Sequence, residues 1–159
     1  NPRVQVEHTI TEMITGVDLV KMGIRVAAGE ELPISQDEIQ FSGHAIQCRL
    51  NAEDPIKFIP SPGKLWDCHF PGGRGVRVDT HAHIGYEMPG CFDSLLAKLI
   101  VWAPDRDEAI AKMKVALGET TLIGVQTVIP LHLAILNEPD FIARDVTIQY
   151  LEDHPNLLG

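Results

Sequence analysis

The sequence predicts an α+β fold, mainly an antiparallel sheet with flanking helices, and three observations support this class. Apolar residues recur at helical spacing near both ends of the chain. Between these regions lie short segments that are typical of strands. Proline and glycine separate the segments, and such short connections favour antiparallel neighbours over the long crossovers that parallel strands require.

Length and composition limit the class of protein further. The chain has 159 residues, 45% of them hydrophobic, which is enough for one domain with a core, or for one domain and part of another. Its 22 acidic and 13 basic residues give a net charge of −9, which argues against binding a nucleic-acid backbone or an anionic membrane surface. No uninterrupted apolar run reaches the roughly 18 residues of a membrane-spanning helix.

The cysteine pattern predicts a protein of a reducing compartment. None of the three cysteines has the C-x-x-C spacing of a zinc or redox site: Cys48, Cys68 and Cys91. We therefore expect free thiols and a cytoplasmic location. The chain begins at Asn1 without an initiator methionine or a signal-peptide pattern, so we expect it to be a fragment of a longer protein.

The first residues are expected to be extended and to lead into a long helix. Arg3, Gln5 and Glu7 alternate with less polar neighbours, as on one face of a strand. Thr9 and Glu12 then have the spacing of a capping box. Apolar residues recur near a period of 3.6 from there on, which predicts one helix over residues 10–28.

The end of that helix and the start of the next region follow from the sequence. Gly29 suits the position just after a helix, because glycine readily adopts a left-handed conformation. The helical pattern gives way to strand patterns near residues 41–43, where we expect a domain boundary. Four strands are expected, over residues 45–51, 64–70, 75–80 and 95–102.

Two more helices are expected in the last third of the chain. Helical periodicity returns over residues 109–117, with Asp105 or Asp107 as the N-cap and Gly118 or Gly124 near the end. A short helix is expected to start at Pro130, because proline suits the first turn of a helix.

The first block of the sequence contains candidates for chemistry. Asn1, Arg3, Gln5 and Glu7 combine a forked cation, two amides and a carboxylate at every second position. A planar oxyanion is bound by a guanidinium and amide donors, and a base must stand beside the proton that it removes. An ordinary solvated edge strand would show the same pattern, so composition alone leaves both interpretations open.

Arg49 is the second candidate. Strand alternation places it with Ala45 and Gln47 on one face, opposite an apolar face that suits the core. The guanidinium is therefore directed away from the core, although an ordinary exposed arginine would fit this pattern equally well.

The same two regions carry a resemblance to biotin carboxylases. Residues 1–12 resemble their N-x-R-x-Q-V-E-H-x-x-T-E signature, and residues 43–55 resemble the block G-H-A-x-x-x-R-x-x-A-E-D-P. Further matches follow in order, at Ser61–Lys64, Pro71–Gly73, Tyr86, Asp93–Leu99 and Tyr150–Leu151. The resemblance thus covers essentially the whole chain.

The resemblance implies part of a biotin-dependent carboxylase, such as acetyl-CoA carboxylase. Residues 1–41 would be the tail of an ATP-grasp domain, and residues 42–159 would be the biotin carboxylase C-terminal domain. Such enzymes are ligases that use ATP, bicarbonate and Mg²⁺ or Mn²⁺ to carboxylate N1′ of biotin on a carrier protein, by way of carboxyphosphate. The implied partners are a biotin carboxyl carrier protein, a carboxyltransferase and a second copy in a homodimer, with no nucleic acid and no membrane.

The resemblance also assigns roles to the candidate residues. Arg3, Gln5 and the backbone of Val6 would hold bicarbonate, and Glu7 would deprotonate it. Because a carboxylate in water is a poor base for bicarbonate, Glu7 would have to be buried near other negative charge. Arg49 would stabilise the enolate oxyanion that forms on the biotin ureido group.

Other family positions are matched less closely. Asn1 would lie beside the metal-bound phosphates, while Ile148 and Gln149 would lie against the adenine of the nucleotide. Arg74 and Arg77 match positions of a homodimer interface, although Arg74 replaces an apolar residue that is common there.

Two alternatives remain open at this point. The chain could be a module for dimerisation or carrier docking, or part of another ATP-grasp ligase, such as a carbamoyl-phosphate or purine-pathway enzyme. For the chain by itself we expect folding without ATP turnover.

Overall fold

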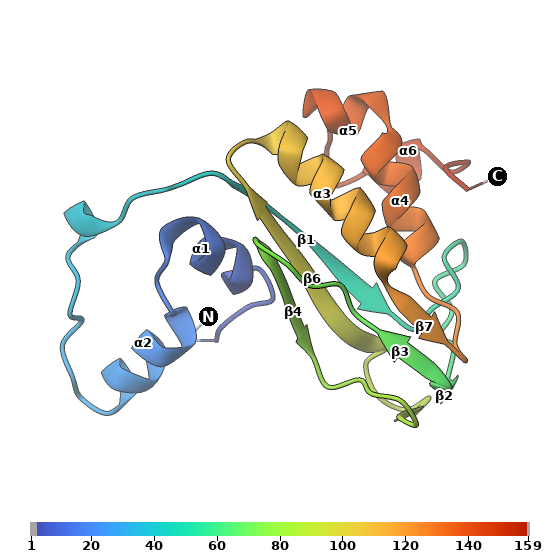
Figure 1. Cartoon of the computed structure of the whole chain (residues 1–159), viewed down its shortest axis with the longest axis horizontal. Helices are drawn as coiled ribbons and strands as arrows, with labels where there is room; N and C mark the ends of the chain where they lie inside the picture. The colour runs from blue at the N-terminus through green and yellow to red at the C-terminus, as the bar shows by residue number, and fades with distance from the viewer. Residues whose placement is uncertain (1–2, 159) are drawn as a thin grey trace.

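The computed structural model describes residues 3–158 and places a central antiparallel sheet between helices on its two faces (Figure 1). The helices are α1 (His8–Thr15), α2 (Leu19–Ala27), α3 (Arg106–Glu119), α4 (Ile129–Asn137), α5 (Pro139–Ala143) and α6 (Tyr150–Asp153), and a 3-10 turn forms η1 (Gln36–Glu38). The strands are β1 (His44–Asn51), β2 (Gly63–Lys64), β3 (Asp67–His69), β4 (Val76–Thr80), β5 (Glu87–Met88), β6 (Leu95–Ala103) and β7 (Thr121–Ile123). The α+β class and the antiparallel pairing predicted from the sequence are confirmed.

The central sheet has the strand order β1-β6-β4, so β6 lies in the middle and β1 at an edge. Both neighbours run antiparallel to β6, and their register places Arg49, Lys98 and Asp79 in one row across the sheet. Two further antiparallel pairs join β2 to β5 and β3 to β7. The mostly apolar sequence of β6 fits a strand that is covered on both faces.

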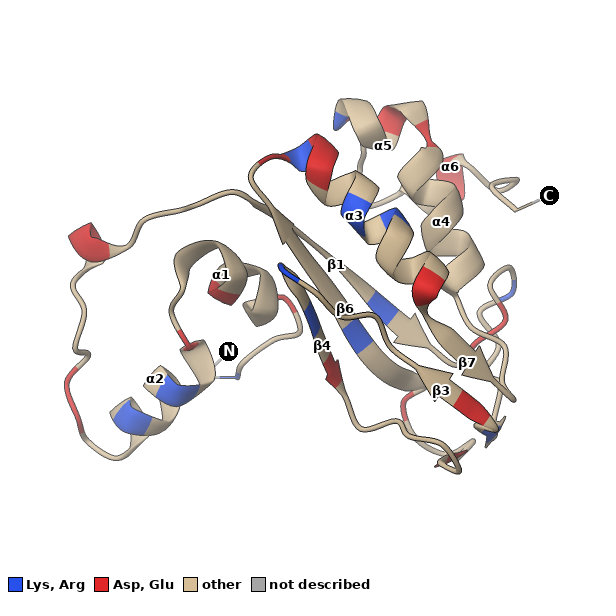
Figure 2. Ribbon diagram, in the orientation of Figure 1, with Lys and Arg blue, Asp and Glu red and all other residues tan. Residues whose placement is uncertain are grey.

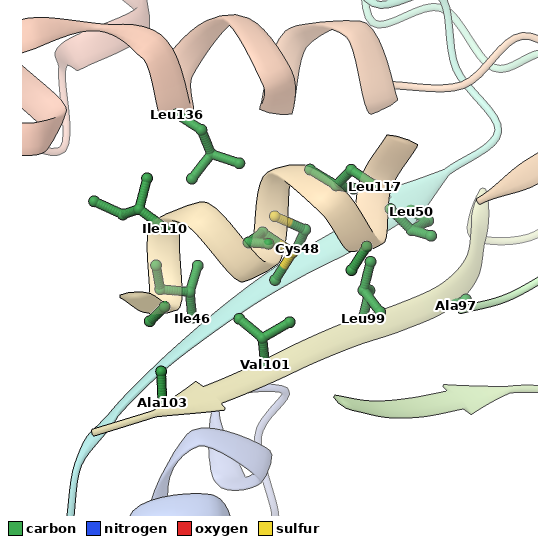
Figure 3. Packing of buried hydrophobic residues seen from close by; sticks show 13 residues of the cluster. Ile46, Cys48, Leu50, Ala97, Leu99, Val101, Ala103, Ile110, Leu117 and Leu136 are labelled. Carbon is green, nitrogen blue, oxygen red and sulfur yellow. The ribbon is translucent and has the colours of Figure 1, made fainter. Parts of the chain in front are cut away.

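The core lies between this sheet and α3 (Figure 3). Every second residue of β1 points into it, as the alternation predicts, and these residues are at most 9% exposed: Ile46, Cys48 and Leu50. Fully buried Leu99 and Val101 of β6 complete the sheet side, and Ile110, Met113 and Leu117 of α3 cover them. Burial raises the pKa of the Cys48 thiol to about 12, which keeps this thiol protonated and unreactive.

The opposite face of the sheet is polar and carries α1, which contacts β1 and β6 (Figure 1). Basic residues of β1, β6 and β4 lie side by side on this sheet (Figure 2). Ile100 is directed to the same face as its cross-strand neighbours Gln47 and Arg77, yet it is fully buried. The two faces therefore differ in chemistry, with an apolar core under α3 and an ionic and hydrogen-bonded layer under α1.

The single helix predicted over residues 10–28 is wrong, because two helices occupy this region. Gly16 ends α1 in the left-handed conformation at φ 73°, and Asp18 then caps α2 by accepting a hydrogen bond from the Lys21 backbone N–H at 2.8 Å. The predicted capping box is also absent, since Glu12 accepts from the Leu19 N–H at 2.9 Å instead. Gly29 follows α2 with φ 89°, as expected for a residue just past a helix.

Two of the predicted extended segments also differ from the structure. In place of one strand over residues 64–70 there are two short strands, β2 and β3, which pair with different partners. Residues 3–7 form an irregular segment and a turn that leads into α1, rather than a strand. Pairing of such short strands is set by contacts across the fold, which local alternation does not record.

The later helices agree with their sequence signals. Asp105 caps α3 by accepting from the Glu108 N–H at 2.9 Å, and Pro130 lies in the first turn of α4. The sequence missed α5, α6, β5 and β7, which are too short to show a period. Over residues 3–158, no helix combines the length and the apolar character needed to cross a bilayer.

The segment between α2 and β1 is held by hydrogen bonds at Ser42, just before it enters the sheet. The Ser42 N–H donates to the Ile14 carbonyl at 2.8 Å, and the Trp102 indole N–H donates to the Ser42 carbonyl at 2.8 Å. Gly43 follows at φ 69°, where a Cβ atom would lie 2.4 Å from the Ala103 carbonyl oxygen. The chain therefore enters β1 along a fixed path beneath the end of α1.

Candidate functional site

Residues 3–7 and Arg49 line one pocket of about 340 Å³. A pocket of this size is within the range of small-molecule sites, which begins at about 300 Å³. Its lining consists of Arg3, Val4, Gln5, Val6, Glu7 and Arg49. The structure thus brings together the two sequence blocks that were singled out for chemistry.

A turn, rather than a strand, shapes the first of these blocks. The Gln5 carbonyl accepts from the His8 backbone N–H at 3.2 Å and lies 2.6 Å from the His8 Nδ1. The Ile10 N–H donates to the Glu7 carbonyl at 3.0 Å, so Glu7 immediately precedes the first turn of α1. Arg3 and Glu7 therefore reach the same pocket through a chain reversal, and not through strand alternation.

Side chains of α1 attach this turn to the sheet. The buried Thr9 hydroxyl donates to the Gln47 side-chain oxygen on β1, two residues before Arg49. One turn further along α1, the Arg77 guanidinium of β4 pairs with Glu12 at 2.6 Å. These two contacts fix α1, and with it residues 3–7, against the sheet that carries Arg49.

The ion pair at Arg77 is part of a longer network. Asp79 accepts from Arg77 Nε at 2.8 Å and from Lys98 Nζ at 3.0 Å. The hydrogen bond from Arg77 to Asp79 is the largest influence raising the pKa of the arginine, so its charge is permanent. Burial alone would raise the pKa of Asp79, but the hydrogen bonds and charges of Arg77 and Lys98 outweigh it and leave this pKa below its ordinary value.

The lowered pKa of Asp79 predicts a contribution to stability that depends on pH. A carboxylate whose pKa is lowered by folding stabilises the fold at every pH above its unfolded value, about 3.9, and this contribution disappears as the pH falls through the lowered folded value. Asp79→Asn is expected to lower the free energy of unfolding by about 1–2 kcal/mol near neutral pH, and by much less in strong acid. Denaturant titrations of both chains from about pH 2 to pH 7 would measure this, and a difference independent of pH would contradict it.

Arg49 has more freedom than Arg77. Its side chain is 45% exposed, and Asp93, whose side chain is 70% exposed, lies 3.8 Å away. An exposed pair at this distance contributes at most about 1 kcal/mol, so the Arg49 guanidinium can exchange Asp93 for another anion. Asp93 was not singled out as a site residue, although it begins one of the sequence blocks that carry the resemblance.

Partly buried polar groups stabilise the end of the strand that carries Arg49. The Asn51 amide donates to Glu53 and to the Ser94 hydroxyl, both at 3.0 Å, and Ser94 also donates to Glu53. The register between β1 and β6 shifts at Leu50 and Asn51, next to this cluster. These hydrogen bonds join the end of β1 to the loop that presents Asp93.

The pocket is built for anions. It combines the guanidinium groups of Arg3 and Arg49 with the Gln5 amide, and such groups bind planar oxyanions through several hydrogen bonds at once. Glu7 adds one carboxylate that can accept a proton. Glu7 is exposed, however, so the burial expected for a strong base is not provided by the described part of the chain.

The described residues do not form a metal site. Over residues 3–158 there is no group of three or more His, Cys, Asp or Glu side chains that could hold a metal ion. Asn1, predicted to lie beside metal-bound phosphates, is outside the described residues.

The remaining predicted site residues lie away from this pocket. Ile148 is completely exposed, and Gln149 is the N-cap of α6. Arg74 lies in an exposed turn before β4, while Arg77 is occupied by Glu12 and Asp79. The predicted roles of these four residues, in nucleotide binding and in a dimer interface, stay predictions.

Family models match both parts of the chain. A model described as "Biotin carboxylase C-terminal domain" matches residues 47–153, and one described as "Carbamoyl-phosphate synthase L chain, ATP binding domain" matches residues 1–35.

Individual proteins match almost the whole chain. Biotin carboxylase of Pseudomonas aeruginosa is 50% identical over 152 residues, which are 96% of this chain and 34% of that protein. The 2-oxoglutarate carboxylase small subunit of Hydrogenobacter thermophilus is 51% identical over 158 residues, which are 99% of this chain and 34% of that protein. The chain thus spans about a third of the length of these relatives.

A solved structure matches the fold closely. It is the biotin carboxylase domain dimer of the Hydrogenobacter thermophilus 2-oxoglutarate carboxylase, in complex with MgADP, ADP and bicarbonate. The TM-score is 0.97 at 50% sequence identity, and the match covers 100% of this chain and 35% of that one.

Proposed function

Because this chain belongs to the biotin carboxylase C-terminal domain family, we propose that it is part of an ATP-dependent ligase that carboxylates the N1′ nitrogen of biotin. The family and its relatives favour this function over a module for docking alone, and over other ATP-grasp ligases. The whole enzyme would perform the first half-reaction of a biotin-dependent carboxylase. Residues 1–41 would be the C-terminal tail of the ATP-grasp domain, and residues 42–159 would form the biotin carboxylase C-terminal domain.

The observation that carries the proposal is the convergence of Arg3, Gln5, Glu7 and Arg49 on one pocket. In the proposed reaction the Arg3 guanidinium and the Gln5 amide hold bicarbonate through charge-assisted hydrogen bonds. Glu7 takes the proton of bicarbonate, and the freed oxygen attacks the γ-phosphate of ATP to give carboxyphosphate and ADP. Carboxyphosphate then breaks down to carbon dioxide and phosphate.

Arg49 would act in the second stage. The released phosphate takes the N1′ proton of biotin, and negative charge develops on the ureido oxygen as this proton leaves. The resulting enolate attacks carbon dioxide through N1′, and the charge passes to the new carboxylate. A guanidinium in the same pocket stabilises the ureido oxyanion, which is absent in the ground state, and therefore lowers the barrier. The loose contact between Arg49 and Asp93 leaves the arginine available for this role.

Glu7 is exposed in this chain, so its proton affinity would have to be raised by other parts of the proposed enzyme. We expect the rest of the ATP-grasp domain and the bound nucleotide to cover the pocket during the reaction, because desolvation beside phosphate charge raises the proton affinity of a carboxylate. ATP with Mg²⁺ or Mn²⁺ would supply the phosphoryl group and its charge neutralisation. Ile148 and Gln149 would lie near the adenine.

The partners follow from the same proposal. A biotin carboxyl carrier protein would deliver biotin, a carboxyltransferase would receive the carboxyl group, and the cytoplasm would be the location. Of the two predicted homodimer interface residues, Arg74 is the more accessible, because it lies in an exposed turn. Arg77 already binds two carboxylates of its own chain and would act in a dimer mainly by shaping the surface around α1.

The experiment that tests the function is bicarbonate-dependent ATP hydrolysis by the full-length protein, with and without free biotin. We expect biotin to stimulate hydrolysis, and we expect the 159-residue chain alone to fold but to show no turnover. Hydrolysis of ATP by the full-length protein without any response to biotin would contradict the proposal and indicate a ligase with another acceptor.

A further inference from the structure

The outer edge of β1, behind the pocket, is held by α4. Because β1 pairs with β6 on one side only, the carbonyls on its other side need partners from elsewhere in the fold. The Asn51 carbonyl accepts from the Val128 backbone N–H at 3.3 Å, and the Arg49 carbonyl accepts from His132 Nε2 at 2.8 Å. Both contacts come from the beginning of α4.

The order of the two contacts gives the direction of α4 along this edge. The Val128 N–H, at the N-cap of α4, reaches Asn51, and the His132 side chain, four residues later, reaches Arg49, two residues earlier on β1. The start of α4 therefore runs alongside the edge of β1 in the opposite direction, and its two donors bind two successive outward carbonyls.

The chemistry of the His132 contact is unambiguous. A carbonyl oxygen only accepts, so Nε2 must carry the proton, whichever charge state the ring adopts. Burial lowers the pKa of the His132 imidazole, and the bond to the Arg49 carbonyl offsets this only in part. The ring is therefore neutral near neutral pH, with its proton on the nitrogen that faces Arg49.

From this geometry we infer that His132 is a positioning residue for Arg49. The inference rests on the proposed function of Arg49. His132 fixes the orientation of the peptide group that contains the Arg49 carbonyl. In this way it determines the direction in which the Arg49 side chain extends from β1 into the pocket lined by Arg3 and Glu7. The contact links α4 to the pocket through the backbone, without any contact between His132 and a substrate.

The test uses variants of the full-length protein. His132→Leu removes the donor, whereas His132→Gln retains an N–H at a similar distance from the backbone. Asn137→Leu is the matched control, because it removes a side-chain bond on the same helix, from Nδ2 to the Leu133 carbonyl at 2.7 Å, that does not reach β1. Each variant is assayed for biotin-stimulated ATP hydrolysis and crystallised.

We expect His132→Leu to lower kcat of the biotin-stimulated reaction roughly 10- to 100-fold, the loss typical of a misplaced reacting group, with the KM for ATP changed less than twofold. His132→Gln is expected to recover most of this rate, and Asn137→Leu to remain within twofold of the unaltered protein. Combining His132→Leu with Arg49→Ala should slow the reaction no further than Arg49→Ala alone, because both act through one group.

Several results would overturn the inference. These are an unaltered rate in His132→Leu, a glutamine variant as slow as the leucine variant, or a double variant in which the two losses multiply. The crystal structures decide the matter independently of activity, since an Arg49 that keeps its position in His132→Leu refutes the inference. Failure of the proposed function itself would be recognised differently, by an unaltered protein that does not respond to biotin.

Discussion

Replacing Glu7 with glutamine in the full-length protein is expected to lower bicarbonate-dependent ATP hydrolysis about 10²- to 10⁴-fold, the range of a lost general base. Glutamine keeps the size of the side chain and can still accept a hydrogen bond, but it cannot take the bicarbonate proton. The loss should be the same with and without biotin, because the proposed proton transfer precedes the biotin stage.

The measurement is kcat for phosphate release at saturating ATP and bicarbonate. Glu31→Gln provides a matched control, since Glu31 is an exposed glutamate between α2 and β1, outside the pocket lining. A Glu7→Gln protein that retains more than about a tenth of the unaltered rate would remove Glu7 from the role of base.

Replacing Arg49 with alanine is expected to abolish the stimulation of ATP hydrolysis by biotin, with a loss of about 10²- to 10³-fold in the biotin-dependent rate. The reason is that a group aimed at a developing oxyanion acts mainly in the transition state. Arg49→Lys should recover only part of the rate, because an ammonium group lacks the planar fork of a guanidinium.

The control for Arg49 is Arg25→Ala, which removes a partly exposed arginine of α2 that pairs with Glu30 at 2.6 Å, outside the pocket lining. Sedimentation analysis of each variant separates catalysis from assembly. If Arg49→Ala disrupted association and left the biotin response intact, Arg49 would belong to a docking surface instead of a catalytic site.

Local patterns predicted the strands and helices whose period is long enough to be visible. The alternation in β1 correctly placed Ile46, Cys48 and Leu50 in the core, and Asp105 marked the start of α3. The same approach failed at Gly16, because a left-handed glycine inside a helical pattern interrupts the helix without changing the apolar period. It failed at residues 3–7 because their alternation carries no information about whether a partner strand exists.

Prediction of the site depended more on the resemblance to biotin carboxylases than on local sequence patterns. Arg3 and Glu7 reach Arg49 only because Thr9 binds Gln47 and Glu12 binds Arg77, and these contacts join segments that are distant in the sequence. No spacing rule within a segment can show them. The contact of His132 was missed for the same reason, since its helix gives no sign of which strand edge lies beside it.

The position of β6 in the middle of the sheet also determines the order in which the site can form. During synthesis β1 emerges well before β6, yet β6 is the only strand of the described sheet that pairs with it. Joining segments so far apart in sequence closes a long loop, which slows folding. Until Leu95–Ala103 has been made, the chain carries an unpaired strand with three core residues, Ile46, Cys48 and Leu50, and such nascent strands are prone to aggregation. Early shielding of β1, for example by a chaperone, would therefore raise the yield of folded protein.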